Sequence, residues 1–315
     1  MTSPGTPLDH LAPGLAVPRD ADAGYGDGLD RGVSLGGGGL FFVAWQVGYL
    51  HGIAGHGIRL DTANRVVGTS AGSLVASALV AGHLRRLHFQ LAELSRIPRL
   101  LSTLAPAGDL HPSQQRALDL FRTAGDAEEV TVRNIGHAAL AAQTPKARVM
   151  RRSVALVLGR GRLTADSLCV TCVDGYTGER CVITRQAEVT IPAAVAASSA
   201  VPGLFAPQPI GDRRCMDGGV SGTGTHLDLL TGARRVMVLA LSDGSDLETG
   251  TMTVAPGSHE QELDHVRAAG GDVFLRVPEL VTLDELMSPA AVPAALAMGA
   301  RQAAADATEL ASFWN

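Results

Sequence analysis

Several features that define other classes of protein are missing from this chain of 315 residues. Aromatic residues make up only 4%, the formal net charge is −5, and no basic stripe is interleaved with aromatic residues, so we expect no nucleic-acid partner. No run of about 18 uninterrupted apolar residues occurs, so the sequence predicts no membrane span. No basic segment followed by an apolar core lies near residue 1, so we expect no secretory signal and a cytoplasmic protein.

Cysteine is also scarce, with four residues in the chain. Cys169-x-x-Cys172 suggests a metal site, with Cys181 and Cys215 as further ligands. The spacing lacks a second Cys-x-x-Cys or a histidine pair, and residues three apart in an alternating strand point to opposite faces. We therefore expect no metal and reduced thiols in the core, which suits an intracellular compartment.

Apolar residues, by contrast, make up 46% of the chain and suffice for a large aliphatic core. Valine-rich segments, which are typical of strands, alternate with segments rich in alanine and leucine. This alternation predicts an α/β protein, a three-layer α/β sandwich around a mostly parallel central sheet. We expect residues 31–315 to form a single domain. Residues 1–30 are rich in Gly, Pro and Asp without periodicity, which predicts a mobile tail.

The sequence Gly-Thr-Ser-Ala-Gly at residues 68–72 follows a predicted strand at 65–67 and precedes a predicted helix at 74–80. Ser70 would lie at the corner, with Gly68 and Gly72 as the nucleophile elbow, because such a turn leaves no room for side chains beside the nucleophile. The N–H groups that open the helix would stabilise negative charge on a reacting acyl group. The alternative is a chance match in a chain with 37 glycines.

Four consecutive glycines at residues 36–39 follow another predicted strand. The N–H groups of Gly37, Gly38 and Gly39 would approach a ligand closely and form an oxyanion hole. A dinucleotide fingerprint is one alternative, but it fails on spacing because Phe41 stands where the third glycine belongs. A flexible surface loop is the other, and the apolar residues 40–45 that follow at once argue against it.

Asp217 begins an Asp-Gly-Gly sequence that, taken alone, is also a common tight turn. Shortly before it, residues 197–205 read Ala-Ser-Ser-Ala-Val-Pro-Gly-Leu-Phe. The glycine block, Gly-Thr-Ser-Ala-Gly, this segment and Asp-Gly-Gly occur in the order found in patatin-like phospholipases, which the chain resembles over residues 32–245. The resemblance implies a patatin-like fold and a Ser-Asp dyad. Ser70 would be the nucleophile, Asp217 its base, and Gly37, Gly38 and Gly39 the oxyanion hole.

The chain departs from the family pattern at two places. Leu40-Phe41-Phe42 stand where the family usually has an Arg-Gly pair, which bears on the shape of the oxyanion loop. Residues 220–226 follow Asp-Gly-Gly where the family often has an Asn-Pro turn, so we expect a different local path beyond the base.

An aspartate with the ordinary pKa of about 3.9 is a poor base for a hydroxyl at neutral pH. We expect burial beside Leu204, Phe205 and Met216 to raise the pKa of Asp217. The competing hypothesis is a Ser-His-Asp triad, because Ser70, Asp217 and His226 follow the order of α/β-hydrolases. We favour the dyad, since a lone histidine after a loop rich in Gly and Thr is more often exposed than catalytic.

Residues 83–125 contain many leucines with arginines between them. They would form a helical lid in which Arg86, Arg96 and Arg99 contact an anionic membrane surface. The alternative is an ordinary helix with its leucine face packed on the sheet, which we favour. We expect the alanine-rich stretch 289–314 to be an amphipathic helix packed on the core.

The function that these residues predict is a serine-dependent lipid acyl hydrolase acting on a lipid or acyl ester without a cofactor. Ser70 would attack the ester carbonyl and water would release the acyl group from a covalent acyl-serine intermediate. Two alternatives stay open. The altered loop could leave a catalytically silent lipid-binding module, or the same acyl-enzyme could serve an acyltransferase.

Overall fold

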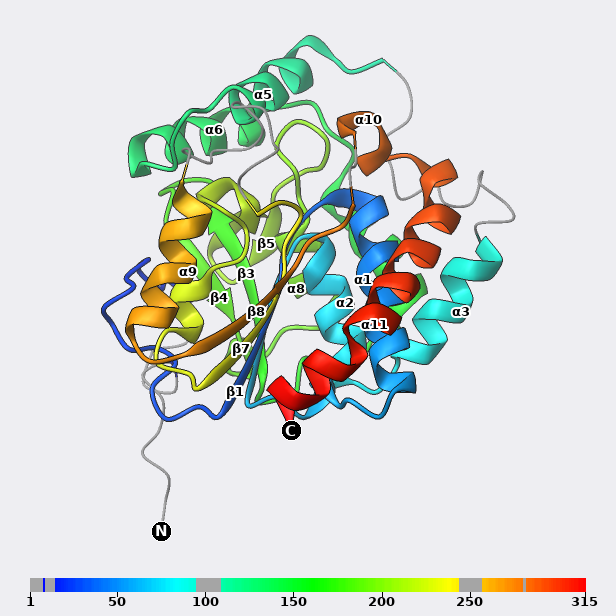
Figure 1. Cartoon of the computed structure of the whole chain (residues 1–315). Helices are drawn as coiled ribbons and strands as arrows, with labels where there is room; N and C mark the ends of the chain where they lie inside the picture. The colour runs from blue at the N-terminus through cyan, green and yellow to red at the C-terminus, as the bar shows by residue number, and fades with distance from the viewer. Residues whose placement is uncertain (1–7, 9–14, 95–108, 244–256, 280–281) are drawn as a thin grey trace.

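The computed structural model describes residues 8, 15–94, 109–243, 257–279 and 282–315. They form a mixed, mostly parallel sheet flanked by helices (Figure 1), which confirms the predicted α/β sandwich. The sheet order is β5-β6-β3-β2-β1-β7-β8, with β4 paired to β3. The strands are β1 (Arg31–Leu35), β2 (Arg65–Thr69), β3 (Leu168–Asp174), β4 (Arg180–Ile183), β5 (Gln208–Ile210), β6 (Arg213–Asp217), β7 (Arg235–Leu239) and β8 (Asp272–Arg276).

Strand β1 lies inside the sheet and pairs in parallel with β2 and β7, while β2 also pairs in parallel with β3 and β7 with β8. The pairings of β3 with β4 and β6, and of β5 with β6, are antiparallel. Both faces of the parallel part are covered, so strands such as β2 are buried at every position, as expected for a sheet between two helical layers.

The two helical layers differ in size (Figure 1). Helices α1, α2, α8 and α11 cover one face over the larger apolar core, and α9 lies on the other face. The described helices are α1 (Gly39–Gly55), α2 (Ala71–Val80), α3 (Leu84–Leu94), α5 (Pro112–Arg122), α6 (Glu129–Ala141), α7 (Ala147–Leu158), α8 (Ile191–Ser198), α9 (Ser258–Ala268), α10 (Leu283–Leu286) and α11 (Val292–Trp314).

Helices α1 and α11 pack side by side at very close range (Figure 1). A Cβ atom at Gly48 would lie 2.3 Å from the Leu296 carbonyl oxygen, and one at Gly299 would lie 2.2 Å from that of Trp45. Glycine on each helix therefore permits a backbone approach that any side chain would block. The C-terminal stretch predicted to pack on the core does so through α11, which buries Leu310 and Trp314.

The chain before β1 contacts the domain at Leu8 and over residues 15–30, where we had predicted a tail. The Val17 N–H donates to the Arg180 carbonyl at 3.0 Å, and the Gly26 N–H donates to that of Thr231 at 2.9 Å. Val17 and Tyr25 are buried. Residues 15–30 therefore cover part of the face that also carries α9.

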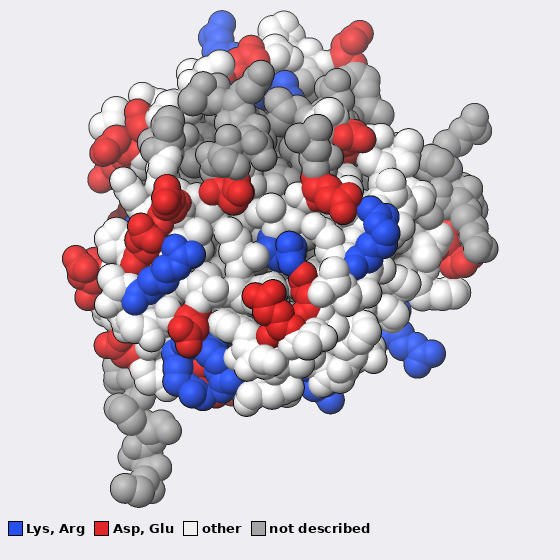
Figure 2. All heavy atoms as spheres, viewed as in Figure 1, with Lys and Arg blue, Asp and Glu red and all other residues white. Residues whose placement is uncertain are grey.

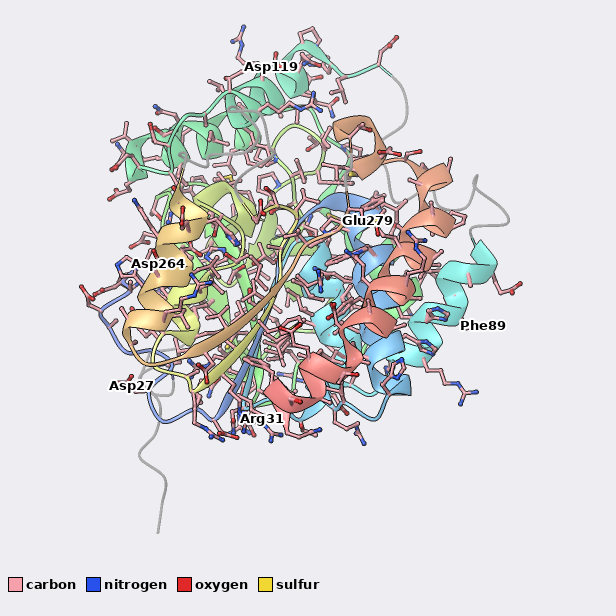
Figure 3. The ribbon with its side chains drawn as sticks, viewed as in Figure 1. Asp27, Arg31, Phe89, Asp119, Asp264 and Glu279 are labelled. Carbon is pink, nitrogen blue, oxygen red and sulfur yellow. The ribbon has the colours of Figure 1, made fainter. Side chains whose placement is uncertain are left out.

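The predicted lid falls partly outside the described residues, since Arg96 and Arg99 lie in the range 95–108. Helix α3 packs on α1 and buries Leu84, Leu87 and Leu91, as in the alternative of an ordinary packing helix. Phe89, which is 64% exposed, lies on the outer side of α3 (Figure 3).

Candidate active site

The pairing of three strands brings Ser70 and Asp217 together although they are far apart in the sequence. Strand β2 pairs with β3 up to Thr69, opposite Thr171. The next residue of β3 is Cys172. On the edge of β3 that pairs with β2, Cys172 pairs with Asp217 of β6, because β4 pairs with the opposite edge of β3. Strand β6 thus continues the sheet where β2 ends. The last residue of β6 lies beside the turn that carries Ser70.

Ser70 occupies a strained turn between β2 and α2. Its φ is 51° and its ψ is −120°, a region that non-glycine residues rarely adopt and that costs of order 1–3 kcal/mol. Neighbouring contacts hold this conformation: the Ser70 N–H donates to Ser198 Oγ at 2.8 Å, and Ser73 Oγ donates to the Ser70 carbonyl at 2.7 Å. This conformation places the Ser70 hydroxyl at the corner between β2 and α2.

The two flanking glycines are required by close backbone contacts. A Cβ atom at Gly72 would lie 1.9 Å from the Leu35 carbonyl oxygen, and one at Gly68 would lie 2.8 Å from the Gly72 carbonyl oxygen. The Gly72 N–H also donates to the Gly36 carbonyl at 3.1 Å. The elbow is therefore joined directly to the glycine block.

The glycine block lies against Ser70. A Cβ atom at Gly37 would be 3.1 Å from Ser70 Cβ and 3.8 Å from its Oγ, so Gly37 borders the hydroxyl. Gly39 has a φ of 68°, and a Cβ atom there would meet the Leu286 carbonyl oxygen at 2.6 Å. The chain turns here from β1 into α1, whose first N–H groups have no acceptor within the helix. Leu40, Phe41 and Phe42, which replace the family's usual Arg-Gly pair, are buried in α1.

Asp217 is 3% exposed at the end of β6. Burial raises the pKa of its carboxyl group to about 6, while the Ser70 hydroxyl and the Gly219 N–H, which stabilise the charged form, partly oppose this. Oδ1 accepts from the Gly219 N–H at 2.8 Å. Among the described residues, Oδ2 has no direct hydrogen-bond partner, although the Ser70 hydroxyl is close enough to affect the pKa of this carboxyl group. We expected burial to raise the pKa of Asp217, and burial is the main cause of its raised pKa.

His226 does not join this pair. Its Nε2 lies 3.2 Å from the Gly218 carbonyl oxygen and its Nδ1 lies 3.4 Å from Arg180 Nη1. Burial, together with the Arg180 charge, lowers the pKa of His226 to about 3, so the ring is neutral. Because both ring nitrogens are engaged elsewhere, the geometry speaks against a triad. The histidine is also 2% exposed, where we had expected a surface residue.

A cavity of about 430 Å³ opens beside the pair. Ser70, Asp217 and the glycines at 37–39 form part of its wall. The rest is mainly apolar and comes from several helices and from the segment after α8, including Leu87, Leu118, Phe121, Met150, Val154 and Phe205. Such a cavity fits a long apolar group whose reactive end lies next to Ser70.

Two contributors to this site were absent from the sequence predictions. Ser198, which binds the Ser70 N–H, lies in the segment 197–205 but carried no predicted role. Helix α7 lines the cavity through Met150, Val154 and Val157. Its apolar residues at spacings of three and four, between basic ones, were the available signal.

The surface around α7 is strongly basic. Residues 143–165 contain six Lys or Arg and no Asp or Glu. On α7 the side chains of Arg148, Val149, Arg152 and Leu156 are exposed, and Leu156 is 80% exposed. On the face of the molecule in Figure 2, by contrast, acidic and basic side chains are interspersed. Helix α7 therefore offers exposed apolar and cationic groups next to the cavity.

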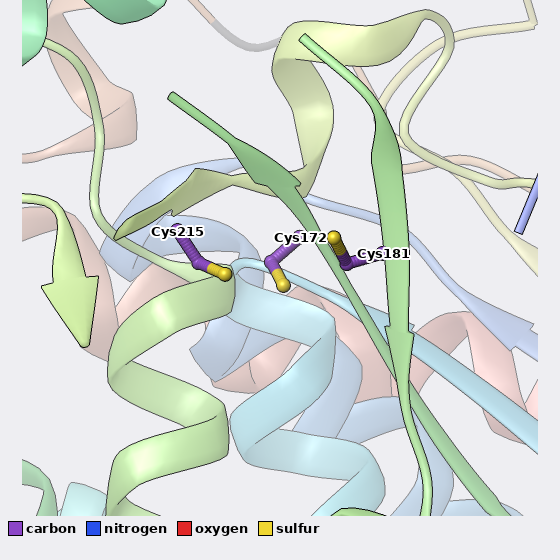
Figure 4. Close-up of side chains that lie close together, drawn as sticks. All are labelled: Cys172, Cys181 and Cys215. Carbon is purple, nitrogen blue, oxygen red and sulfur yellow. The ribbon is translucent and has the colours of Figure 1, made fainter. Parts of the chain in front are cut away.

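Three cysteines meet beneath the site (Figure 4). Cys172 lies directly opposite Cys181 across β3 and β4, and Cys215 comes two residues before Asp217 on β6. The three thiols are free and buried. Hydrogen bonds from the Cys172 and Cys215 thiols lower the pKa of the Cys181 thiol. Cys169 points into the core on the opposite face, as the alternation along the strand predicted.

Among the described residues, no helix has both the length and the apolar character needed to cross a bilayer. The family model described as patatin-like phospholipase matches residues 33–228, which is more than half of the chain. This match confirms the resemblance found in the motifs. A search of the curated proteins gave no match.

Proposed function

Because the chain belongs to the patatin-like phospholipase family, we propose that it is a serine-dependent lipid acyl hydrolase using a Ser70–Asp217 dyad. One observation carries the proposal: a serine on a strained turn lies near a buried carboxyl group whose pKa is about 6, in the wall of an apolar cavity. Family membership supports lipid hydrolysis in general, and this geometry supports the residue roles.

Acylation begins when Ser70 Oγ attacks the ester carbonyl carbon and its proton passes to Asp217. The carbonyl oxygen becomes an oxyanion in a tetrahedral intermediate. N–H groups of Gly37, Gly38 and Gly39 and of the start of α2 would donate to it. The carbon–oxygen bond to the alcohol then breaks, and Asp217 returns the proton to the departing alkoxide.

Deacylation repeats these steps with water as the nucleophile. Asp217 takes a proton from the water, whose oxygen attacks the acyl-serine carbonyl, and then returns the proton to Ser70 Oγ as the carboxylic acid leaves. The pKa near 6 suits both steps, because the carboxylate is mostly ionised at neutral pH yet more basic than an exposed aspartate.

The cavity beside the dyad would hold the acyl chain. Its walls are apolar and no metal or cofactor is required for the steps above. Helix α7 would bring this cavity to a membrane, since a basic helix with exposed Val149 and Leu156 suits an anionic lipid surface. This assigns the predicted peripheral contact to α7 rather than to Arg86 on α3 or to Arg96 and Arg99, which lie outside the described residues.

A fluorophosphonate ester, which reacts covalently with activated serines, tests the dyad. We expect labelling of the wild-type protein at Ser70, and none in Ser70→Ala. Ser153→Ala is the matched control because Ser153 lines the same cavity on α7. Peptide mapping by mass spectrometry locates the label.

Release of fatty acid from phospholipid, lysophospholipid and neutral ester vesicles then identifies the substrate. A folded wild-type protein that binds lipid but neither labels nor releases fatty acid would contradict the hydrolase and favour a silent binding module. Ester products formed on addition of an alcohol would instead identify acyl transfer.

A further inference from the structure

The strongest unassigned group of side chains in the described part of the molecule is the cluster of Cys172, Cys181 and Cys215. Their three Sγ atoms lie within 4.8 Å of one another and all three residues are 0% exposed. Each comes from a different strand, so the register of β4, β3 and β6 fixes the arrangement. The three cysteine side chains lie next to one another in Figure 4.

Three sulfur atoms bound to one central ion would be roughly 4 Å apart at a metal–sulfur distance of about 2.3 Å. The observed separations are at most 4.8 Å, so a shift of less than about 1 Å, which rotation of the side chains could supply, would bring them to this geometry. Each thiol that binds an ion releases its proton to the solvent, and no electron is transferred. The cluster is therefore close to the geometry of a three-sulfur metal site.

The three sulfur atoms limit which metal ions could bind at this cluster. Thiolates select soft ions such as Cu(I) and zinc. Structural zinc sites are almost always four-coordinate, and iron–sulfur clusters are usually held by four protein ligands. Within the described residues no fourth His, Cys, Asp or Glu joins the three thiols, and all three cysteines are 0% exposed.

We propose that Cys172, Cys181 and Cys215 form a three-coordinate site for a single Cu(I) ion. The site lies beside the proposed active site, because Cys172 is directly opposite Asp217 across β3 and β6. Residues directly opposite in an antiparallel pair project from the same face of the sheet. The proposal does not depend on the hydrolase activity, and its test uses no substrate.

The test is an anaerobic titration of the reduced protein with Cu(I) in the presence of bicinchoninate, a coloured Cu(I) chelator. We expect the wild-type protein to remove one equivalent of Cu(I) from the chelator and to gain a thiolate-to-copper absorption band in the ultraviolet. Cys172→Ala should weaken Cu(I) binding at least tenfold. Cys169→Ala is the matched control, since Cys169 lies on the same strand but faces the other side of the sheet.

Cys181→Ala and Cys215→Ala provide independent tests should Cys172→Ala fail to fold, which circular dichroism would reveal. The proposal is overturned if the wild-type protein leaves all Cu(I) with the chelator, or if folded variants of the cluster bind as well as Cys169→Ala. It is equally overturned if zinc displaces Cu(I) from the protein, or if the purified protein has lost two of the three thiols to a disulfide.

Discussion

Asp217 lies in an environment very different from that of a free side chain in water, because it is 3% exposed. Burial places its pKa at about 6, close to the pH at which it would act. We expect kcat/KM for a soluble short-chain ester to rise tenfold per pH unit below about pH 6 and to level off above it, because only the carboxylate accepts the Ser70 proton. A pH–rate profile measures this. A rate that stays constant down to the ordinary aspartate pKa of about 3.9 would contradict the raised pKa of Asp217 in its role as the base.

The same burial reduces the stability of the folded chain. The folded-state pKa of Asp217 lies above the unfolded value, so between about pH 4 and pH 6 the folded state binds more protons and the free energy of unfolding falls as pH rises. Asp217→Asn removes this buried charge. We expect the variant to lose turnover and, at neutral pH, to gain up to about 3 kcal/mol in free energy of unfolding.

Urea denaturation at neutral pH and near pH 4 measures this gain, which should shrink at the lower pH. Asp228 is the opposite case, because the Arg180 charge holds the pKa of Asp228 below its usual value despite burial. Asp228→Asn should therefore destabilise the protein at neutral pH. A loss of stability in both variants would contradict the assignment of a raised pKa to Asp217.

How far the sequence predicts the site can be judged from these residues. Ser70 and its glycines follow from local chemistry, since a sharp strand-to-helix turn restricts its neighbours. The partnership of Ser70 with Asp217 rests on the resemblance to the family, because no local pattern reports that β6 continues the sheet where β2 ends. The position of His226 was missed for the same reason: its contacts with Gly218 and Arg180 depend on tertiary packing.

Among the elements, α7 makes a contribution that its local sequence suggests only weakly. We expect the double variant Arg148→Glu/Arg152→Glu to bind anionic vesicles of phosphatidylglycerol and phosphatidylcholine at least about thirtyfold more weakly, given about 1 kcal/mol per basic residue near such a surface. Co-sedimentation in the Ser70→Ala background avoids hydrolysis. Arg267→Glu/Arg301→Glu, with the same change in charge on α9 and α11, should bind as Ser70→Ala does. Equal losses in both double variants would point to net charge rather than α7.

The contact between α1 and α11 depends on glycine at Gly48 and Gly299. Gly299→Ala would place a Cβ atom 2.2 Å from the Trp45 carbonyl oxygen and force the helices apart. We expect a loss of about 1–3 kcal/mol in free energy of unfolding, measured by urea denaturation. Gly55→Ala is the control, because a Cβ atom at that end of α1 meets nothing within 4 Å. Equal stability of the two variants would show that the helices can separate without cost.

The order of elements and the mostly parallel sheet were predictable, because valine-rich strands and alanine-rich helices alternate along the chain. The register was not, and register decides which cysteines meet. Cys169 and Cys172 are close in sequence but face opposite cores, whereas Cys172, Cys181 and Cys215 converge from three strands. Pairing between distant strands depends on packing that no short window of sequence contains.

At the scale of the whole molecule, the segment before β1 shows where the folded unit begins. Composition predicted a tail over residues 1–30, because Gly, Pro and Asp discourage regular structure. Irregular backbone still packs when its polar groups find partners. The Arg180 side chain is 1% exposed, and it donates to the carbonyl oxygens of Val17 and Pro18 at 3.1 and 2.7 Å. Residues 15–30 thus supply acceptors to a buried cation.

A chain that begins at residue 31 would leave Arg180 with buried donors lacking those acceptors and would uncover the core beside Val17 and Tyr25. Each unsatisfied donor costs about 1–3 kcal/mol, so we expect Tm to fall by on the order of 5–10 °C in thermal scans. A chain that begins at residue 8 keeps the Arg180 contacts with Val17 and Pro18 and should unfold as the full chain does. An unchanged Tm for the shorter chain would show that residues 8–30 add nothing to stability, whereas the expected fall places the start of the folded unit before residue 31.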